Sequence, residues 1–303
     1  MKRRLVLLSL AFALLLAACE QAPPQAKALQ YTRVPAGHAV PLYRFAIHPL
    51  HNPKKLSEAY QPLIDHLNRR IPGVRIELEA SRDYQVYEQK FRDREPAFLL
   101  PNPWQTLQAI KVGYHVIAMA GDADDFRGVF IVRRDSGIKT PADLMGKVVS
   151  YPSHTALAAA VMPQYYLHTH GIDINRDIRN HYVGSQESSI MNAYLGQSAA
   201  GATWPLPWRL FQRDHPAEAA QLELIWTTPP LLNNSVMVRD DVPLALREQV
   251  RKALVELAET PAGEAILGGM ETARFHPADN ADYDTVRDYI ARFEREVRPV
   301  ERE

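Results

Sequence analysis

The stretch Lys147–Trp208, KVVSYPSHTALAAAVMPQYYLHTHGIDINRDIRNHYVGSQESSIMNAYLGQSAAGATWPLPW, decides the fold because it repeats one pattern of strand, loop and helix. The apolar run KVVSY is followed by the loop PSHT and an alanine-rich helical segment that starts near Ala156. The run NHYV, the loop GSQES and a helix ending at Gly196 repeat the pattern. A third apolar run, AAGAT, leads into Trp204 and a tryptophan-proline turn. Strands that alternate with helices predict a parallel sheet.

In each of these units the loop ends where a helix begins. The first N–H groups of a helix have no partner within the helix, and the positive end of the helix dipole lies there. Such a position suits a small polar or anionic ligand. Open α/β sheets bind ligands at the carboxyl ends of their strands, so we expect a ligand site at this edge.

The same pattern extends on both sides of this stretch. Upstream, apolar runs at 44–47, 74–78, 97–100 and 116–120 alternate with helical segments, and helices are expected at 243–259 and 282–297. The runs RGVFIVR and SVMVR are expected to cross between two lobes. The predicted fold is α/β with two lobes, each a mostly parallel sheet flanked by helices. The predicted boundaries are 40–131 plus 236–303 for lobe one and 132–235 for lobe two.

Composition sets the class of protein. The chain has 303 residues, of which 46% are hydrophobic and 23% charged, and this is globular composition. The formal net charge is zero, so no broad basic surface argues for a nucleic-acid partner. We expect a monomer.

The N-terminus has the pattern of a targeting segment. Three basic residues precede an apolar run, Leu5–Leu16, that is too short for a spanning helix. The run ends in Leu-Ala-Ala-Cys, which resembles a bacterial lipobox, and Cys19 is the only cysteine. The prediction is a lipoprotein signal peptide at 1–18, lipidation at Cys19 and a flexible tether at 19–39, with Glu20 favouring the outer membrane. The alternative is an ordinary secretory signal with an incidental cysteine.

Three motifs resemble the periplasmic substrate-binding proteins of ABC importers for phosphonate, phosphite and related oxyanions. They are PADLMGKVVSYPSHTALAAAVMPQYYLHTHGID, VGSQESSIMNAYLGQSAAGATW and SVMVRDDVPLALREQVRKALVELAETPAGEAIL, in that order. The resemblance covers nearly the whole mature chain. It implies a type II periplasmic-binding fold whose lobes close on a ligand, and a membrane partner that reads the closed form. That partner is an ABC permease or, alternatively, a sensor histidine kinase.

The chain departs from the family at its ligand contacts. The resemblance places a hydroxyl-rich Ser-Thr-Ser-Gly type run on Ala156–Ala159, which removes three hydroxyl groups. It places an acidic family residue on Ala199 and an aromatic one near Pro101. We therefore expect phosphate and simple phosphonates to bind weakly, and the ligand to be larger or only weakly charged.

Other polar and aromatic residues at strand ends are the candidates for the site. In lobe two these are Tyr151, Ser153, His154, Thr155, Ser185, Glu187, Ser188, Thr203 and Trp204. In lobe one they are His48, His51, Asn102 and Trp104. Each has an ordinary structural alternative: serine and threonine cap helices, tryptophan fills cores, and histidine lies on surfaces.

The histidine pattern and the fold each allow another function. The sequence His48-x-x-His51 with His154 could supply imidazole ligands for zinc, but loop histidines without a fixed motif are weak signals, and we predict no metal and no cofactor. The same fold resembles some pyrimidine-forming proteins of the thiamine pathway, which would make this an enzyme. The chain has no nucleophile elbow, phosphate-binding glycine loop or HExxH helix, so we predict that it is not an enzyme.

Overall fold

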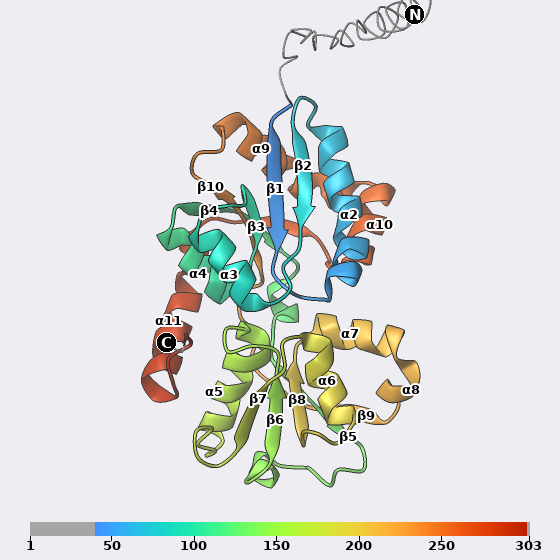
Figure 1. The fold of residues 1–303 in the computed structure, drawn as a ribbon, viewed down its shortest axis with the longest axis vertical. Coiled ribbons are helices and arrows are strands. Elements are labelled where there is room, and N and C mark those ends of the chain that lie inside the picture. The colour runs from blue at the N-terminus through green and yellow to red at the C-terminus, as the bar shows by residue number, and fades with distance from the viewer. Residues whose placement is uncertain (1–39, 302–303) are drawn as a thin grey trace, which may run out of the picture. The chain divides into compact units, whose positions relative to one another are not determined.

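The computed structural model describes residues 40–301. Two mixed sheets flanked by helices form two lobes in this part of the chain (Figure 1). The predicted signal peptide, Cys19 and the tether lie outside the described residues. Within the described residues, no helix combines the length and the apolar character needed to span a bilayer.

The first sheet has six strands in the order β11-β4-β10-β3-β1-β2. Strand β1 pairs in parallel with β2 and β3, whereas β10 lies antiparallel between β3 and β4 and β11 lies antiparallel to β4. The bounds of these strands are Leu42–Ile47 (β1), Arg75–Glu79 (β2), Phe98–Leu100 (β3), Tyr114–Ala120 (β4), Ser235–Arg239 (β10) and Phe275–Pro277 (β11).

The helices that accompany the first sheet follow the expected segments. They are α2 (Pro53–Arg70), α3 (Tyr84–Arg92), α4 (Pro103–Lys111), α9 (Leu244–Val255) and α10 (Pro261–Gly269). Helix α2 begins at Pro53, because the Asn52 side chain accepts from the N–H of Lys55 and proline is favoured in the first turn. Asn102 caps α4 in the same way and forms a reciprocal capping box with Gln105.

The second sheet has five strands in the order β7-β6-β8-β5-β9. Strands β6, β7 and β8 are parallel, and β5 is antiparallel to both β8 and β9. The strands are β5 (Val129–Arg133), β6 (Val148–Tyr151), β7 (Arg179–Tyr182), β8 (Ala200–Thr203) and β9 (Leu222–Thr227). The helices are α5 (Met162–Thr169), α6 (Gln186–Tyr194), α7 (Pro205–Asp214) and α8 (Pro216–Ala219).

The chain passes between the sheets twice. It leaves the first sheet after β4 and returns to it before β10, so residues 121–128 and 228–234 are the two connecting segments. Strands β5 and β10 each belong to one sheet only. The crossing is therefore made by these segments, and the expectation that RGVFIVR and SVMVR themselves cross was wrong.

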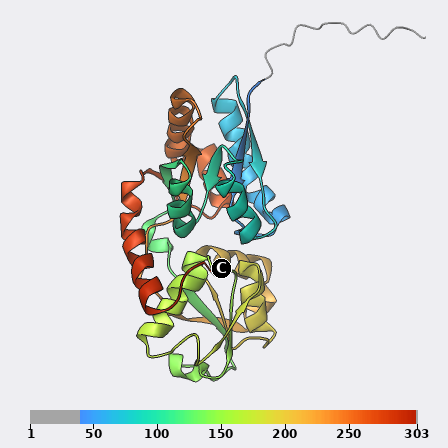
Figure 2. The same cartoon turned by 60° about the vertical axis from the view of Figure 1, so that its left-hand side comes forward.

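The last helix, α11 (Asp284–Glu296), contacts both lobes. It packs against α4, and its Tyr289 and Phe293 rings make edge contacts with Tyr165 on α5. Figure 2 shows it running alongside the two lobes. Beyond it, the Arg298 guanidinium donates to the side chain of Gln164 on α5. The lobe boundaries predicted from the sequence remain a proposal.

Two local features of the second lobe differ from the expectation. The tryptophan-proline turn after β8 is the first turn of α7, with Pro205 at a position where a missing N–H costs nothing. The alanine-rich helix starts with a π-turn, Leu157–Val161, before α5. Pro163 has no N–H to donate to the preceding turn, which accounts for this irregularity. The predicted α/β class, with two lobes built on sheets flanked by helices, is confirmed; both sheets are mixed rather than mostly parallel.

Candidate functional site

A small cavity lies where the strand ends of both sheets meet. We call it the central cavity; its volume is about 10 Å³, so it holds no more than about one water molecule. None of the side chains that line it is a carboxylate, lysine or arginine. They are His48, Tyr84, Asn102, Phe126, Ala156, Leu157, Ala158, Ala159, Gln186, Trp204 and Asn234.

The wall from the second lobe is a helix start without side-chain hydroxyls. Ala156 precedes the helix and provides no side-chain cap. The N–H groups of Ala160 and Val161 both donate to the Ala156 carbonyl, so the helical bonding begins only there. The N–H groups of Leu157, Ala158 and Ala159 thus have no acceptor inside the helix. This wall can donate hydrogen bonds from its backbone to an oxygen of a ligand.

The wall from the first lobe offers acceptors. Burial lowers the pKa of His48 to about 4, with a further contribution from His51, so the imidazole is neutral near pH 7. Its Nδ1 donates to the Leu100 carbonyl, 2.8 Å away, because a carbonyl oxygen can only accept. The other nitrogen, Nε2, consequently carries a lone pair. The Asn234 Oδ1 is buried and accepts no hydrogen bond from the described residues.

Hydrogen bonds join the lobes around this cavity. The Asn102 side chain donates to the Thr155 carbonyl at 3.0 Å, and the Thr155 hydroxyl donates to Glu88 at 2.6 Å. Gln186 donates to the Tyr84 hydroxyl at 3.2 Å. These groups fill the space between the sheets, so a ligand of several atoms enters only when they separate or rotate.

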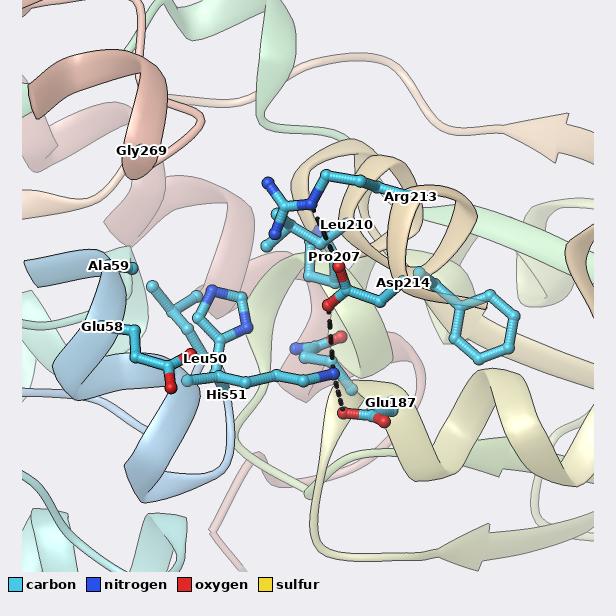
Figure 3. A pocket seen from close by; sticks show the side chains of 13 residues that line it. Leu50, His51, Glu58, Ala59, Glu187, Pro207, Leu210, Arg213, Asp214 and Gly269 are labelled. Atoms are coloured by element: carbon cyan, nitrogen blue, oxygen red, sulfur yellow. Dashed lines mark hydrogen bonds and ion pairs between the residues drawn. The ribbon is translucent and has the colours of Figure 1, made fainter. Parts of the chain in front are cut away.

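A larger pocket opens beside Gln186, between α2 of the first lobe and α6 and α7 of the second. Its volume is about 280 Å³, and we call it the mouth pocket. The Lys55 ammonium lies 3.1 Å from both Glu187 and Asp214 (Figure 3). Glu187 also pairs with His215 at 2.9 Å. Lys55 therefore ties one lobe to two helices of the other.

The structure brings part of the predicted site together. His48, Asn102 and Trp204 line the central cavity, and His51 and Glu187 line the mouth pocket. Two further candidates contact residues of the cavity wall. The Thr155 carbonyl accepts from the Asn102 side chain, and the Thr203 hydroxyl donates to Gln186.

The other candidates have structural contacts instead. The Ser185 hydroxyl accepts from the N–H of Ser188 and caps α6, as its structural alternative predicts. Trp104 is 2% exposed and lies on the groove between α4 and α11, away from the central cavity. The Tyr151 ring makes a tilted contact with the Tyr182 ring, and the His154 ring stacks on the same Tyr182. The Ser153 and Thr155 hydroxyls bond to each other.

Sequence reasoning missed four polar or aromatic residues of the central cavity: Tyr84, Phe126, Gln186 and Asn234. Gln186 follows the predicted cap Ser185, so it was within reach of the strand-end argument. Phe126 and Asn234 lie on the connecting segments, and no periodic pattern marks such positions. The four residues Ala156–Ala159, onto which the resemblance placed the family's hydroxyl run, do line the cavity.

No metal site is formed by the part of the chain that the structure describes: residues 40–301 contain no group of three histidine, cysteine, aspartate or glutamate side chains arranged to hold an ion.

Comparison with known proteins places the chain in a family. The profile of the phosphonate ABC transporter periplasmic substrate-binding proteins matches residues 45–283. A probable ABC transporter phosphite binding protein, PhnD1 of Prochlorococcus marinus strain MIT 9301, is 23% identical over 186 residues. That alignment covers 57% of this chain and 63% of PhnD1.

Solved structures share the fold. A binding protein component of an ABC phosphonate transporter from Pseudomonas aeruginosa superposes with a TM-score of 0.78 at 15% identity, covering 84% of this chain and 87% of that one. The P. marinus PhnD1 in complex with methylphosphonate gives a TM-score of 0.77 at 18% identity, covering 84% and 98%. These relatives are binding proteins of ABC transporters. The prediction that the chain is not an enzyme is confirmed by this family membership. The chain therefore belongs to the family of periplasmic substrate-binding proteins of phosphonate ABC transporters.

Proposed function

We propose that this protein is a lipid-anchored binding protein that captures a small polar molecule in the central cavity and presents it to an ABC permease. The observation that carries the proposal is the cavity itself, which is lined by strand-end residues of both sheets. A ligand that contacts both walls stabilises the closed arrangement by its differential affinity for it. The permease then reads that arrangement.

Ligand contacts on this proposal come from both lobes. The first lobe contributes the side chains of His48 and Asn102. The second lobe contributes Trp204, at the end of β8, and the backbone N–H groups that begin at Leu157. Thr155 and Thr203 hold Asn102 and Gln186 in position. Of the remaining predicted residues, Ser185 caps α6, and His51 and Glu187 line the mouth pocket.

The test is to identify the captured molecule. The domain from Val40 onward, expressed in the periplasm, is expected to retain a small molecule that native mass spectrometry detects and that mild denaturation releases. A Leu157→Pro substitution removes a donor from the cavity wall. Leu244→Pro, at the exposed first position of α9, makes the same kind of change away from the cavity and is the control. Loss of the molecule in both variants, or in neither, would contradict the proposed site.

The second candidate function is ligand sensing with a membrane histidine kinase as partner. The same lobe closure serves either partner, so the genes beside this one separate the two. A permease and ATPase support import, and a histidine kinase supports sensing.

A further inference from the structure

The residue that follows helix α10 faces two arginines of helix α7. The Glu271 carboxylate lies 3.3 Å from the Arg209 Nε and 3.6 Å from the Arg213 Nη1. Glu271 stands between α10 and β11, which belong to the first lobe, whereas α7 belongs to the second. Glu271 is not among the residues that line the central cavity. These two ion pairs therefore join the lobes away from that cavity.

Both arginines are oriented by further contacts. The Arg209 guanidinium donates to both oxygens of Asp125, in the connecting segment 121–128, at 2.9 and 2.7 Å. The Arg213 Nε donates to the neighbouring Asp214 at 3.0 Å. The two cations are thus held in place from the side of α7 and the connecting segment. Glu271 is the carboxylate that the first lobe contributes to them.

The backbone of Glu271 has a conformation that favours glycine. Its φ is 52°, and among the described residues other than glycine only Arg94 also has a positive φ. The N–H of Glu271 donates to the Gly268 carbonyl, and the N–H of Thr272 donates to the Leu267 carbonyl. This pair of hydrogen bonds ends a helix with one left-handed residue, which is usually glycine.

A glutamate at this position has a cost that a glycine would not have, because its Cβ crowds the backbone in the left-handed region. The cost is the same in open and closed lobes, since the backbone hydrogen bonds lie within the end of α10. The ion pairs to Arg209 and Arg213 form only when the lobes are closed. Strained residues of this kind are concentrated at functional and switching positions.

We propose that Glu271 stabilises the closed arrangement before any molecule is captured. Its pairing with Arg209 and Arg213 keeps a fraction of the molecules closed, and salt reduces that fraction because all three side chains are partly exposed. This closure goes beyond the proposed function, in which the captured molecule stabilises the closed lobes. A closed fraction that exists beforehand strengthens capture, because the ligand has less of the equilibrium to shift.

Spin-label distances between the lobes measure this closure without a ligand. Cys19 is the only cysteine of the chain, so the domain from Val40 onward can be labelled at introduced cysteines alone. Ser57→Cys on α2 and Ala217→Cys on α8 place one label on an exposed position of each lobe. Double electron–electron resonance, after removal of any retained molecule, is expected to show a closed and an open distance. Raising NaCl from about 20 to about 500 mM should lower the closed fraction.

Two variants separate the carboxylate from the backbone. Glu271→Gln and Glu271→Gly both remove the charge, and each is expected to lower the ratio of closed to open molecules roughly fivefold and to weaken its salt dependence. Glu271→Gly also relieves the left-handed backbone, so it should melt at a higher temperature than Glu271→Gln. Glu264→Gln, an exposed position of the same helix, is the control and should leave the ratio unchanged.

Three results would overturn the role of Glu271. One is the absence of a closed distance in the wild-type domain at low salt, and another is a wild-type ratio in Glu271→Gln. The third is an equal loss of closure in Glu264→Gln, which would assign the effect to net charge. If Glu271→Gly melts no higher than Glu271→Gln, glutamate has no backbone cost at this position. Retention of a small molecule by the domain is measured separately, so the binding function can stand when closure by Glu271 fails.

Discussion

At Gly201, the absence of a side chain lets helix α6 lie directly on strand β8. A Cβ at this position would stand 2.2 Å from the Ser189 carbonyl oxygen, which is backbone and cannot move aside cheaply. Gly201→Ala should therefore destabilise the protein by about 1–3 kcal/mol, the usual cost of overpacking. Urea denaturation gives the free energy of unfolding. Gly268→Ala is the control: nothing lies within 4 Å of its Cβ, and alanine in α10 should stabilise by up to about 1 kcal/mol. Equal effects would refute the steric argument.

Glu88 is a buried carboxyl group between the lobes. Burial raises its pKa, while hydrogen bonds from Thr155 and Gln105 partly oppose the rise. The native state then keeps the proton to higher pH than the unfolded state does. The stability from this group is present below the unfolded pKa of about 4.3 and is lost as pH rises through the raised value.

The prediction for Glu88→Gln follows from that sign. Relative to the wild-type protein, the melting temperature of the variant should increase as pH rises from 4 to 8, because glutamine has no proton to lose. Differential scanning fluorimetry across this range measures the difference. Glu259→Gln, an exposed glutamate, should show no such trend. If the difference in melting temperature between Glu88→Gln and the wild-type protein is constant or shrinks as pH rises, the pKa of Glu88 is not raised in the native state.

At the scale of elements, α2 is joined to α6 and α7 by a single side chain. The Lys55 ammonium pairs with Glu187 and Asp214, each at 3.1 Å, and all three side chains are partly exposed. Pairs of this kind contribute about 0.2–1 kcal/mol each. Together they favour the closed arrangement by about 1 kcal/mol, or roughly fivefold in the equilibrium between open and closed lobes.

Lys55→Met removes this charge and keeps most of the apolar stem. We expect roughly fivefold weaker ligand binding, mainly through faster dissociation, and a smaller dependence of affinity on salt. Surface plasmon resonance with the retained molecule measures both. Lys54→Met, which removes only an exposed pair with Glu58, is the control. If both variants bind the molecule with the same affinity and the same salt dependence, the ion pairs of Lys55 do not stabilise the closed arrangement.

At the scale of the whole molecule, the predicted anchor determines where the protein works. Cys19→Ser should release it from membranes, since acyl chains on that residue would provide stable attachment. Membrane fractionation after a salt wash, followed by immunoblotting, measures this. The variant should appear in the soluble periplasmic fraction while the wild-type protein sediments. A variant that still sediments would mean that the segment is an ordinary signal or that another attachment exists.

The sequence by itself determined the class of the fold and the edge at which the cavity lies. Alternating apolar runs and helical segments specify strands and helices locally. The parallel order of β6, β7 and β8 follows from the helix that lies between each strand and the next. Strand-end reasoning therefore predicted His48, Asn102 and Trp204, which line the central cavity; their role in binding stays a prediction. It also anticipated the loss of hydroxyls at Ala156–Ala159, since the motifs on either side fix the register.

Only the tertiary structure decided which strand-end residues line the central cavity and which pack elsewhere in the fold. Trp104 and Trp204 both follow strands, yet one packs beside α11 and the other lines the cavity, because distant helices cover one face and not the other. Asn234 and Asp124 are far apart in sequence and line one pocket because both connecting segments pass between the lobes. Such contacts depend on the closure of long loops, and no local pattern encodes them.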